Sequence, residues 1–449
     1  MFIGDVRGVG WSAPSTRTWV TVVVALALVL LAGLQIAAAA TGLQGPLHSL
    51  ASDFVATPKS ATVPWVGLSM AMVGLPNRWR IAALLAAVSL DGLFATERLL
   101  RTGVFAVGNG PLIVLTVLAV LVWLRTDGAQ RRIALGGVAC GLLVVVAIKI
   151  GEVWLRLTTI IRPTVWDEYV MLADHALAQP SWWFGRVFAE AGPVATGVLH
   201  WVYIELPAAA MVVAVYQLRN VRSEGWPHHF LVRTFLVLGL IGPAIYVLFP
   251  VVGPEYIFGV AGGSLRVGDY WPQVLPPTHL SPGPVVFDGS ASRNCMPSMH
   301  TAWALAVFIH SRRGPRWLRW GGALWLVGTL AATLGFGYHY GVDLVAGAVL
   351  CLTVEAALRE PVAGRGASRL PVIAAGAAFL AALLIGCRYA AVPMAHYPLL
   401  FGPLIIGLLA VFAIAFYATF FGRPAAVIRD TLVVNLAGVQ PHRAEPEFG

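Results

Sequence analysis

The chain has 449 residues, of which 58% are hydrophobic and only 11% are charged, a composition that excludes a soluble globular protein. Its net charge is +9, but the basic residues are spread over many short loops, so we expect no nucleic acid partner. Four cysteines are too few for a disulfide framework, and a bridge between Cys295 and Cys387 is left open. None of the cysteine and histidine spacings indicates a zinc site.

Apolar runs follow one another along the chain, and a run of about 20 residues is long enough to cross a bilayer. We therefore expect an all-α, polytopic membrane protein with about twelve transmembrane helices. Residues 1–17 lack the pattern of a cleavable signal, so the first run is expected to remain as an anchor. The expected spans are residues 18–40, 62–76, 80–96, 110–124, 133–151, 193–218, 231–250, 299–312, 317–336, 338–357, 369–387 and 399–421.

The organisation along the chain follows from these runs. The expected parts are an N-terminal accessory bundle (1–151), an outer interfacial segment (152–192), a catalytic transmembrane core (193–357), and C-terminal helices with a cytoplasmic tail (358–449). Within the interfacial segment, Pro-Ser-Trp-Trp-Phe at 180–184 predicts a helix that lies in the headgroup plane. Glu205 and Tyr203, inside an apolar run, are not included in the predicted site.

Arginines gather in alternate short loops, as the positive-inside rule produces for cytoplasmic loops. This pattern predicts a multi-pass plasma-membrane protein with both termini in the cytoplasm. Residues 251–298 and the turn before His339 then lie outside, where the long loop either caps the site or only connects two helices. The arginines concerned are Arg78, Arg80, Arg125, Arg131, Arg132, Arg219, Arg222, Arg233, Arg312, Arg313, Arg316, Arg319, Arg359, Arg365 and Arg369.

Two short motifs carry the candidate chemistry: Cys-Met-Pro-Ser-Met-His at 295–300 and Gly-Tyr-His-Tyr-Gly-Val-Asp at 337–343. His339 and Asp343 are four residues apart and would share a helix face. Pro297 suits the first position of a helix, and the amides that follow it would bind an anion. A phosphate between His300 and His339 predicts a phosphoryl-transfer site.

The two motifs resemble the second and third signature motifs of the type 2 phosphatidic acid phosphatase superfamily, which also includes vanadium haloperoxidases. The second motif of that family, P-S-G-H, reads Pro-Ser-Met-His at 297–300. Of the third, S-R-x5-H-x3-D, only His339 and Asp343 are present, because Ala332 and Thr333 stand where Ser and Arg belong.

The first family motif, K-x6-R-P, is degenerate in this chain. Lys149 and Arg156 have the right spacing but are followed by Leu157, whereas Arg162 precedes a proline without a lysine seven residues upstream. Lys149, Arg156 and Arg162 are therefore the candidates to replace the missing arginine of the third motif in binding phosphate.

The resemblance implies a six-helix catalytic core and a metal-independent reaction without a cofactor. His339 would attack phosphorus and form a phosphohistidine, while Asp343 would hold its ring in the nucleophilic tautomer. His300 would act as the acid and then as the base. Ser298 and the backbone amides at 298–299 would bind the phosphate oxygens.

The departures from the motifs, together with Phe-Pro-Val-Val-Gly-Pro at 249–254, look more like inositol phosphorylceramide synthases. The expected function is therefore a transferase that moves a phosphoryl head group from a membrane lipid, a phospholipid or lipid-linked phosphate, to a hydroxyl acceptor. A lipid phosphate phosphatase, a hydrolase with water as acceptor, is the alternative. A transporter predicts two related halves that the sequence lacks, and a scaffold without catalysis leaves both histidines and the aspartate unexplained.

Overall fold

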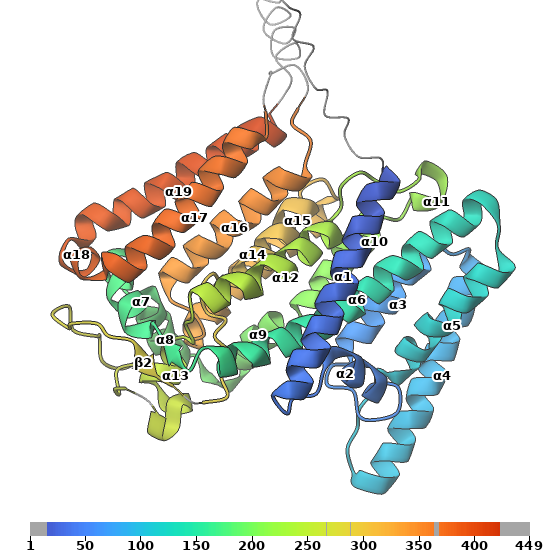
Figure 1. Cartoon of the computed structure of the whole chain (residues 1–449), viewed down its shortest axis with the longest axis horizontal. Helices are drawn as coiled ribbons and strands as arrows, with labels where there is room; N and C mark the ends of the chain where they lie inside the picture. Colours follow the sequence, from blue (N-terminus) through green and yellow to red (C-terminus); the bar gives the residue numbers. More distant parts are fainter. Residues whose placement is uncertain (1–15, 266, 288, 363–367, 423–449) are drawn as a thin grey trace, which may run out of the picture.

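The computed structural model describes residues 16–422 apart from 266, 288 and 363–367, and describes side chains from residue 28 onward. In this part of the chain, the long helices pack side by side, with α17 (Leu370–Tyr389) and α19 (Pro398–Phe420) at one edge and α4 (Asn77–Thr102) and α5 (Asn109–Arg125) at the other (Figure 1). The architecture is helical, as the apolar runs predict.

The N-terminal helices form a bundle around α6, a helix of 34 residues. In this bundle α3 packs along α6 where glycines remove side chains from the contact, at Gly67, Gly137 and Gly141. Such small residues let two helix backbones approach closely in a membrane. Besides α4 and α5, this bundle contains α1 (Thr16–Ala40), α2 (Pro46–Ser52), α3 (Thr62–Val73) and α6 (Gly128–Ile161).

The rest of the chain forms a second group of helices that share a hydrophobic core with α3 and α6. A two-residue antiparallel pairing joins β1 (Thr164–Val165) to β2 (Val285–Val286). The elements are α7 (Asp167–Ala173), η1 (Asp174–Leu177), α8 (Pro180–Glu190), α9 (Gly192–Ile204), α10 (Leu206–Gln217), α11 (Val221–Glu224), α12 (Leu231–Leu248), α13 (Pro254–Phe258), η2 (Val260–Leu265), α14 (Met299–Ser311), α15 (Arg316–Gly335), α16 (Gly341–Leu358) and α18 (Ala391–His396).

Six of the described helices are long and apolar enough to cross a membrane, or seven if the bent pair α9–α10 is one span. The expected count of about twelve is not confirmed, although each expected run overlaps a helix. The helices α3, α5 and α14 have only 12, 17 and 13 residues. The six are α4, α6, α12, α16, α17 and α19.

The segment 152–192 differs from the expected helix in the headgroup plane. Its acidic residues Asp167 and Asp174 are fully buried, and so is Trp182, whereas Trp183 and Phe184 are exposed. The helix α8 packs against α15, and α7 packs against α17 and α18. The segment is therefore a structural part of the bundle, with only one face of α8 free.

The described ends of the chain lie together at one end of the bundle. In Figure 1, the first turn of α1, the last turn of α19 and the short helix α11 lie at one end, whereas α13, β2 and α8 lie at the opposite end. The long segment 251–298 and the loop that carries His339 thus share one end of the molecule, as predicted. The termini and Arg365 lie outside the described residues.

The N-terminal bundle packs against α10 and α12, and two side-chain contacts strengthen this junction. The Thr62 hydroxyl donates to the Glu205 carboxylate at 2.8 Å, at the point where α9 and α10 meet with a bend of 52°. On the other side, the Trp226 indole lies against Gly136 of α6, so closely that a Cβ there would meet it at 2.6 Å. Side chains of the second group therefore hold both α3 and α6.

The glycine contact between α3 and α6 predicts the effect of a single methyl group. A Cβ at Gly141 would overlap the carbonyl oxygen of Gly67, whereas a Cβ at Gly151 of the same helix meets nothing within 4 Å. Gly141→Ala should therefore lower the stability by ~1–3 kcal/mol, despite the better helix propensity of alanine. Gly151→Ala should raise it by up to about 1 kcal/mol.

Thermal unfolding of the two variants in the same detergent measures this difference. An equal response of both variants would contradict the close contact between α3 and α6.

Candidate active site

The two motifs meet at one end of the bundle. His300 lies in the first turn of α14, and His339 lies in the short connection between α15 and α16. Their ring centroids are 6.4 Å apart. Since reacting atoms approach to about 3–3.5 Å, one phosphorus atom fits between the two rings.

The protonation of His339 is set by a backbone group. Its Nδ1 lies 2.8 Å from the carbonyl oxygen of Cys295, an atom that can only accept a hydrogen bond. Nδ1 therefore carries the proton and donates it, which leaves Nε2 with a free lone pair. The ring is nearly buried, at 3% exposure, so this hydrogen bond is shielded from water.

Asp343 lies beside His339, but not on a shared helix face as its spacing suggests. The helix α16 begins at Gly341, so His339 precedes the helix and does not share a face with Asp343. The Asp343 Oδ2 atom accepts from the amide of Tyr340 at 2.7 Å and from the thiol of Cys295 at 2.8 Å. It lies 3.7 Å from His339 Nδ1, which is close enough to stabilise a positive charge on that ring.

The loop before α14 also differs from expectation. Ser298 is the N-cap, and its Oγ accepts from the amide of Thr301, so Pro297 precedes the helix and does not begin it. The Ser298 amide donates to the backbone carbonyl of Asp343 at 3.0 Å. This bond joins the start of α14 to the start of α16. The Ser298 amide, which we expected to bind a phosphate oxygen, therefore already has a partner.

Two buried carboxylates from the segment 152–192 hold the start of α16. Asp167 accepts hydrogen bonds from the Tyr340 hydroxyl at 3.0 Å and from the amide of Gly253 at 2.8 Å. Asp174 accepts from the amide of Val342 at 2.9 Å. The first amides of a helix have no partner within the helix, and Asp174 satisfies one of them. Asp167 instead holds the Tyr340 side chain and the backbone at Gly253, so the two acids together support the loop that carries His339.

Burial changes the proton affinity of these groups. Desolvation raises the pKa of Asp167 and of Asp174 to about 7, although the hydrogen bonds that each accepts oppose the shift. Burial, with the negative charge of Asp343, also raises the pKa of the Cys295 thiol well above its usual range. Cys295 is therefore a protonated donor to Asp343, and all four cysteines are free.

The raised pKa of Asp174 should make the stability of the protein depend on pH. Its pKa rises from 3.8 to about 7 on folding, so the folded protein binds the proton more tightly than the unfolded chain does. This contribution is complete below pH 3.8 and is lost as the pH rises through about 7. Asp174→Asn keeps an acceptor for the Val342 amide but cannot titrate, and it should flatten the fall in melting temperature between pH 3.8 and about 7.

Melting curves of Asp174→Asn and of the exposed control Asp127→Asn, recorded at several pH values in detergent, provide the measurement. The expectation fails if the Asp174 variant keeps the wild-type slope.

Aromatic side chains surround the two histidines. The Tyr203 ring stacks on His300, with centroids 3.9 Å apart, and Tyr338 lies 5.2 Å from Tyr203. In the sequence, Tyr203 is marked only by its position inside an apolar run, which does not indicate that it stacks on His300. A cavity of about 300 Å³ beside Tyr338 is lined also by Tyr256 and Trp271 of the long segment 251–298.

The segment 251–298 lies over the loop that carries His339. The Glu255 amide donates to the carbonyl of Gly337 at 2.9 Å. Gly337 has a φ of +66°, and a Cβ there would meet the Trp271 ring at 2.7 Å. Both the backbone conformation and the close contact require glycine at this position. The segment is thus packed against the site.

The predicted phosphate-binding residues are not all brought together. Lys149 is buried in the N-terminal bundle, with its Nζ 2.6 Å from Asp53. Arg162 donates to the carbonyl of Val247 at 2.6 Å, and Arg156 is exposed. Among the described residues, no hydrogen bond or ion pair joins these three to His300 or His339. A phosphate-binding role for them stays a prediction.

Two groups of three side chains have potential ligand atoms within 4.8 Å of one another: Cys295 with His339 and Asp343, and His229 with His310 and Glu355. In the first, the thiol is protonated and donates to Asp343, which does not suit a metal ligand. The absence of a catalytic metal likewise stays a prediction.

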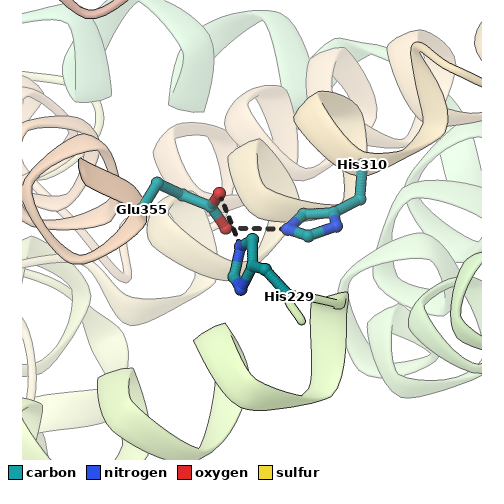
Figure 2. A group of neighbouring side chains, drawn as sticks. All are labelled: His229, His310 and Glu355. Carbon is teal, nitrogen blue, oxygen red and sulfur yellow. Dashed lines mark hydrogen bonds and ion pairs between the residues drawn. The ribbon is translucent and has the colours of Figure 1, made fainter. Parts of the chain in front are cut away.

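The second group is a network around the buried Glu355 (Figure 2). Its carboxylate contacts His310 at 2.8 Å and His229 at 3.2 Å, and it also pairs with Arg359. Because Arg359 already supplies the positive charge, we interpret the group as an ionic network that joins α14 to α16. His310 lies ten residues after His300, roughly 15 Å along the helix.

Two family models match separate parts of the chain. Residues 168–357 match a family model described as the PAP2 superfamily, the type 2 phosphatidic acid phosphatases, and residues 17–157 match a domain of unknown function, DUF5933. No curated protein and no solved structure matches the chain. The first match begins at residue 168, within the segment 152–192, and so includes Asp174. The match over residues 168–357 supports the PAP2 superfamily for this part of the chain, and the apolar helices indicate a multi-pass membrane protein.

Proposed function

We propose that the protein is a membrane-embedded phosphotransferase that moves a phosphoryl head group from a lipid to a hydroxyl acceptor through a phosphohistidine. The observation that carries the proposal is the hydrogen bond from His339 Nδ1 to the Cys295 carbonyl at 2.8 Å. It leaves Nε2 as a nucleophile within reach of a phosphate that also contacts His300. The PAP2 superfamily match and the apolar helices fit a lipid phosphate as substrate.

The reaction has two steps. In the first, His339 Nε2 attacks phosphorus, the bond from phosphorus to the lipid oxygen breaks, and His300 gives that oxygen a proton. In the second, His300 takes the proton of the acceptor hydroxyl, whose oxygen attacks phosphorus and releases His339. Asp343, 3.7 Å from His339 Nδ1, stabilises the positive charge that the ring carries between the steps.

The nature of the acceptor distinguishes a transferase from a phosphatase. Burial of His339 and the aromatic side chains of Tyr203, Tyr338 and Tyr256 around the site limit the access of water, which supports an alcohol as acceptor. The altered motifs support the same choice, since they look like those of inositol phosphorylceramide synthases. Ser298 is proposed to donate its hydroxyl hydrogen to a phosphate oxygen.

Substitution of the three central residues tests the mechanism. His339→Ala and His300→Ala should each lower turnover by roughly 10⁴-fold or more, because neither nucleophile nor acid has a substitute. Asp343→Asn should leave a measurable residue of activity, because the Cys295 carbonyl still fixes the tautomer of His339. Turnover of the purified variants on a labelled phospholipid gives the comparison. Near-wild-type turnover by either histidine variant would exclude the assignment.

The acceptor is identified with the wild-type protein. Purified enzyme incubated with phospholipids labelled in the phosphate should transfer the label to an added lipid or sugar alcohol and release little free phosphate. The His339→Ala variant serves as the blank. Release of free phosphate at the same rate with and without alcohols would instead make the protein a phosphatase.

We also propose that the site faces the outside of a plasma membrane and that both termini are cytoplasmic. The alternation of arginine-rich loops supports this orientation. Ser281, in the segment 251–298, and Ser223, in α11, are both exposed and lie at opposite ends of the bundle. Cysteine at 281 should react with a membrane-impermeant thiol reagent in intact cells, and cysteine at 223 only after lysis.

All four native cysteines are buried, so they can remain in both variants. The reverse labelling pattern would place the site on the cytoplasmic side.

A further inference from the structure

A cavity of about 360 Å³ lies between the N-terminal bundle and the helices that carry the site. Its walls come from α3 and α6 on one side and from α10, α12 and α14 on the other. Its volume lies within the range of about 300–1,000 Å³ for ligand sites. The packing of the two parts of the chain therefore leaves space between them.

The lining of the cavity is mostly apolar. Side chains of Val, Leu, Ile, Met, Ala and Phe make up most of the wall, and the polar members include Tyr203, Asn294, His300 and Glu152. An apolar cavity of this kind does not retain water well but accepts apolar ligands. One with a catalytic histidine in its wall suits a molecule with an apolar chain and a polar head.

The cavity follows the helices for much of the bilayer. Its lining on α12 extends from Leu231 to Tyr246, which is roughly 22 Å at 1.5 Å per residue. The hydrocarbon core of a bilayer is about 30 Å thick. The space is therefore long enough for most of a lipid chain.

We propose that the hydrocarbon chain of the lipid donor lies in this cavity, and that α3 and α6 form one wall of its binding site. This inference rests on the proposed function, because it takes the donor to be a lipid whose phosphate lies between His300 and His339. It gives the N-terminal helices, which lie outside the PAP2 superfamily match, a direct part in substrate binding.

Glycines in the wall allow the cavity to be filled without disturbing its surroundings. A Cβ at Gly151 of α6 or at Gly239 of α12 meets nothing within 4 Å, and both glycines line the cavity. Gly92 of α4 also has open space around it but does not line the cavity. Gly151→Trp and Gly239→Trp are therefore the test variants, and Gly92→Trp is the matched control.

The variants are compared on two donors with the same head group, one with long chains and one with short, water-soluble chains. Gly151→Trp and Gly239→Trp should lower kcat/KM on the long-chain donor at least tenfold, mainly through KM, and change it less than twofold on the short-chain donor. Gly92→Trp should behave as wild type on both. Unchanged kinetics on the long-chain donor, or equal losses on both donors, would overturn the inference.

A second measurement does not depend on turnover. A lipid phosphate with a photoreactive group in its chain, bound to the full-length wild-type protein, should label peptides from α3 and α6, and Gly151→Trp should remove this labelling. If labelling occurs without any turnover, the chain site stands and the proposed function fails. If turnover occurs and the label falls only outside α3 and α6, the inference fails.

Discussion

The position of His300 and His339 depends on how the first turn of α16 is held inside the protein. Asp174 accepts from the amide of Val342, Asp343 from the amide of Tyr340, and Asp167 from the hydroxyl of Tyr340. Without such acceptors, the free amides of a buried helix start would each cost ~1–3 kcal/mol. Desolvation raises the pKa of Asp167 and of Asp174 to about 7, and the nearby charge of Asp343 adds a smaller contribution in the same direction.

The same turn also aligns the second histidine. The Asp343 carbonyl accepts from the amide of Ser298, which caps α14, and the Cys295 carbonyl accepts from His339. Each motif thus supplies a backbone carbonyl that fixes the other motif. This mutual arrangement gives the histidines a defined separation.

The sequence predicts the helices and the meeting of the two motifs well, because apolar runs and spacing report directly on both. The number of spans was less predictable, since the apolar runs of α3, α5 and α14 do not reveal that these helices have only 12, 17 and 13 residues. The support from Asp174 had no local signal, because its partner Val342 lies 168 residues away. Cys295 acts on His339 through a backbone carbonyl, which no side-chain pattern could indicate.

The ionic network around Glu355 has a consequence for selectivity. It joins α14 to α16 at the end away from the motifs, while directional hydrogen bonds fix the same two helices at the site. Between these ends the contacts are mostly apolar, and apolar contacts are non-directional. Geometry is thus strict where the phosphate reacts and tolerant where the chain would lie. Under the proposed function, such an enzyme would discriminate between head groups sharply while accepting donors that differ in chain length and unsaturation.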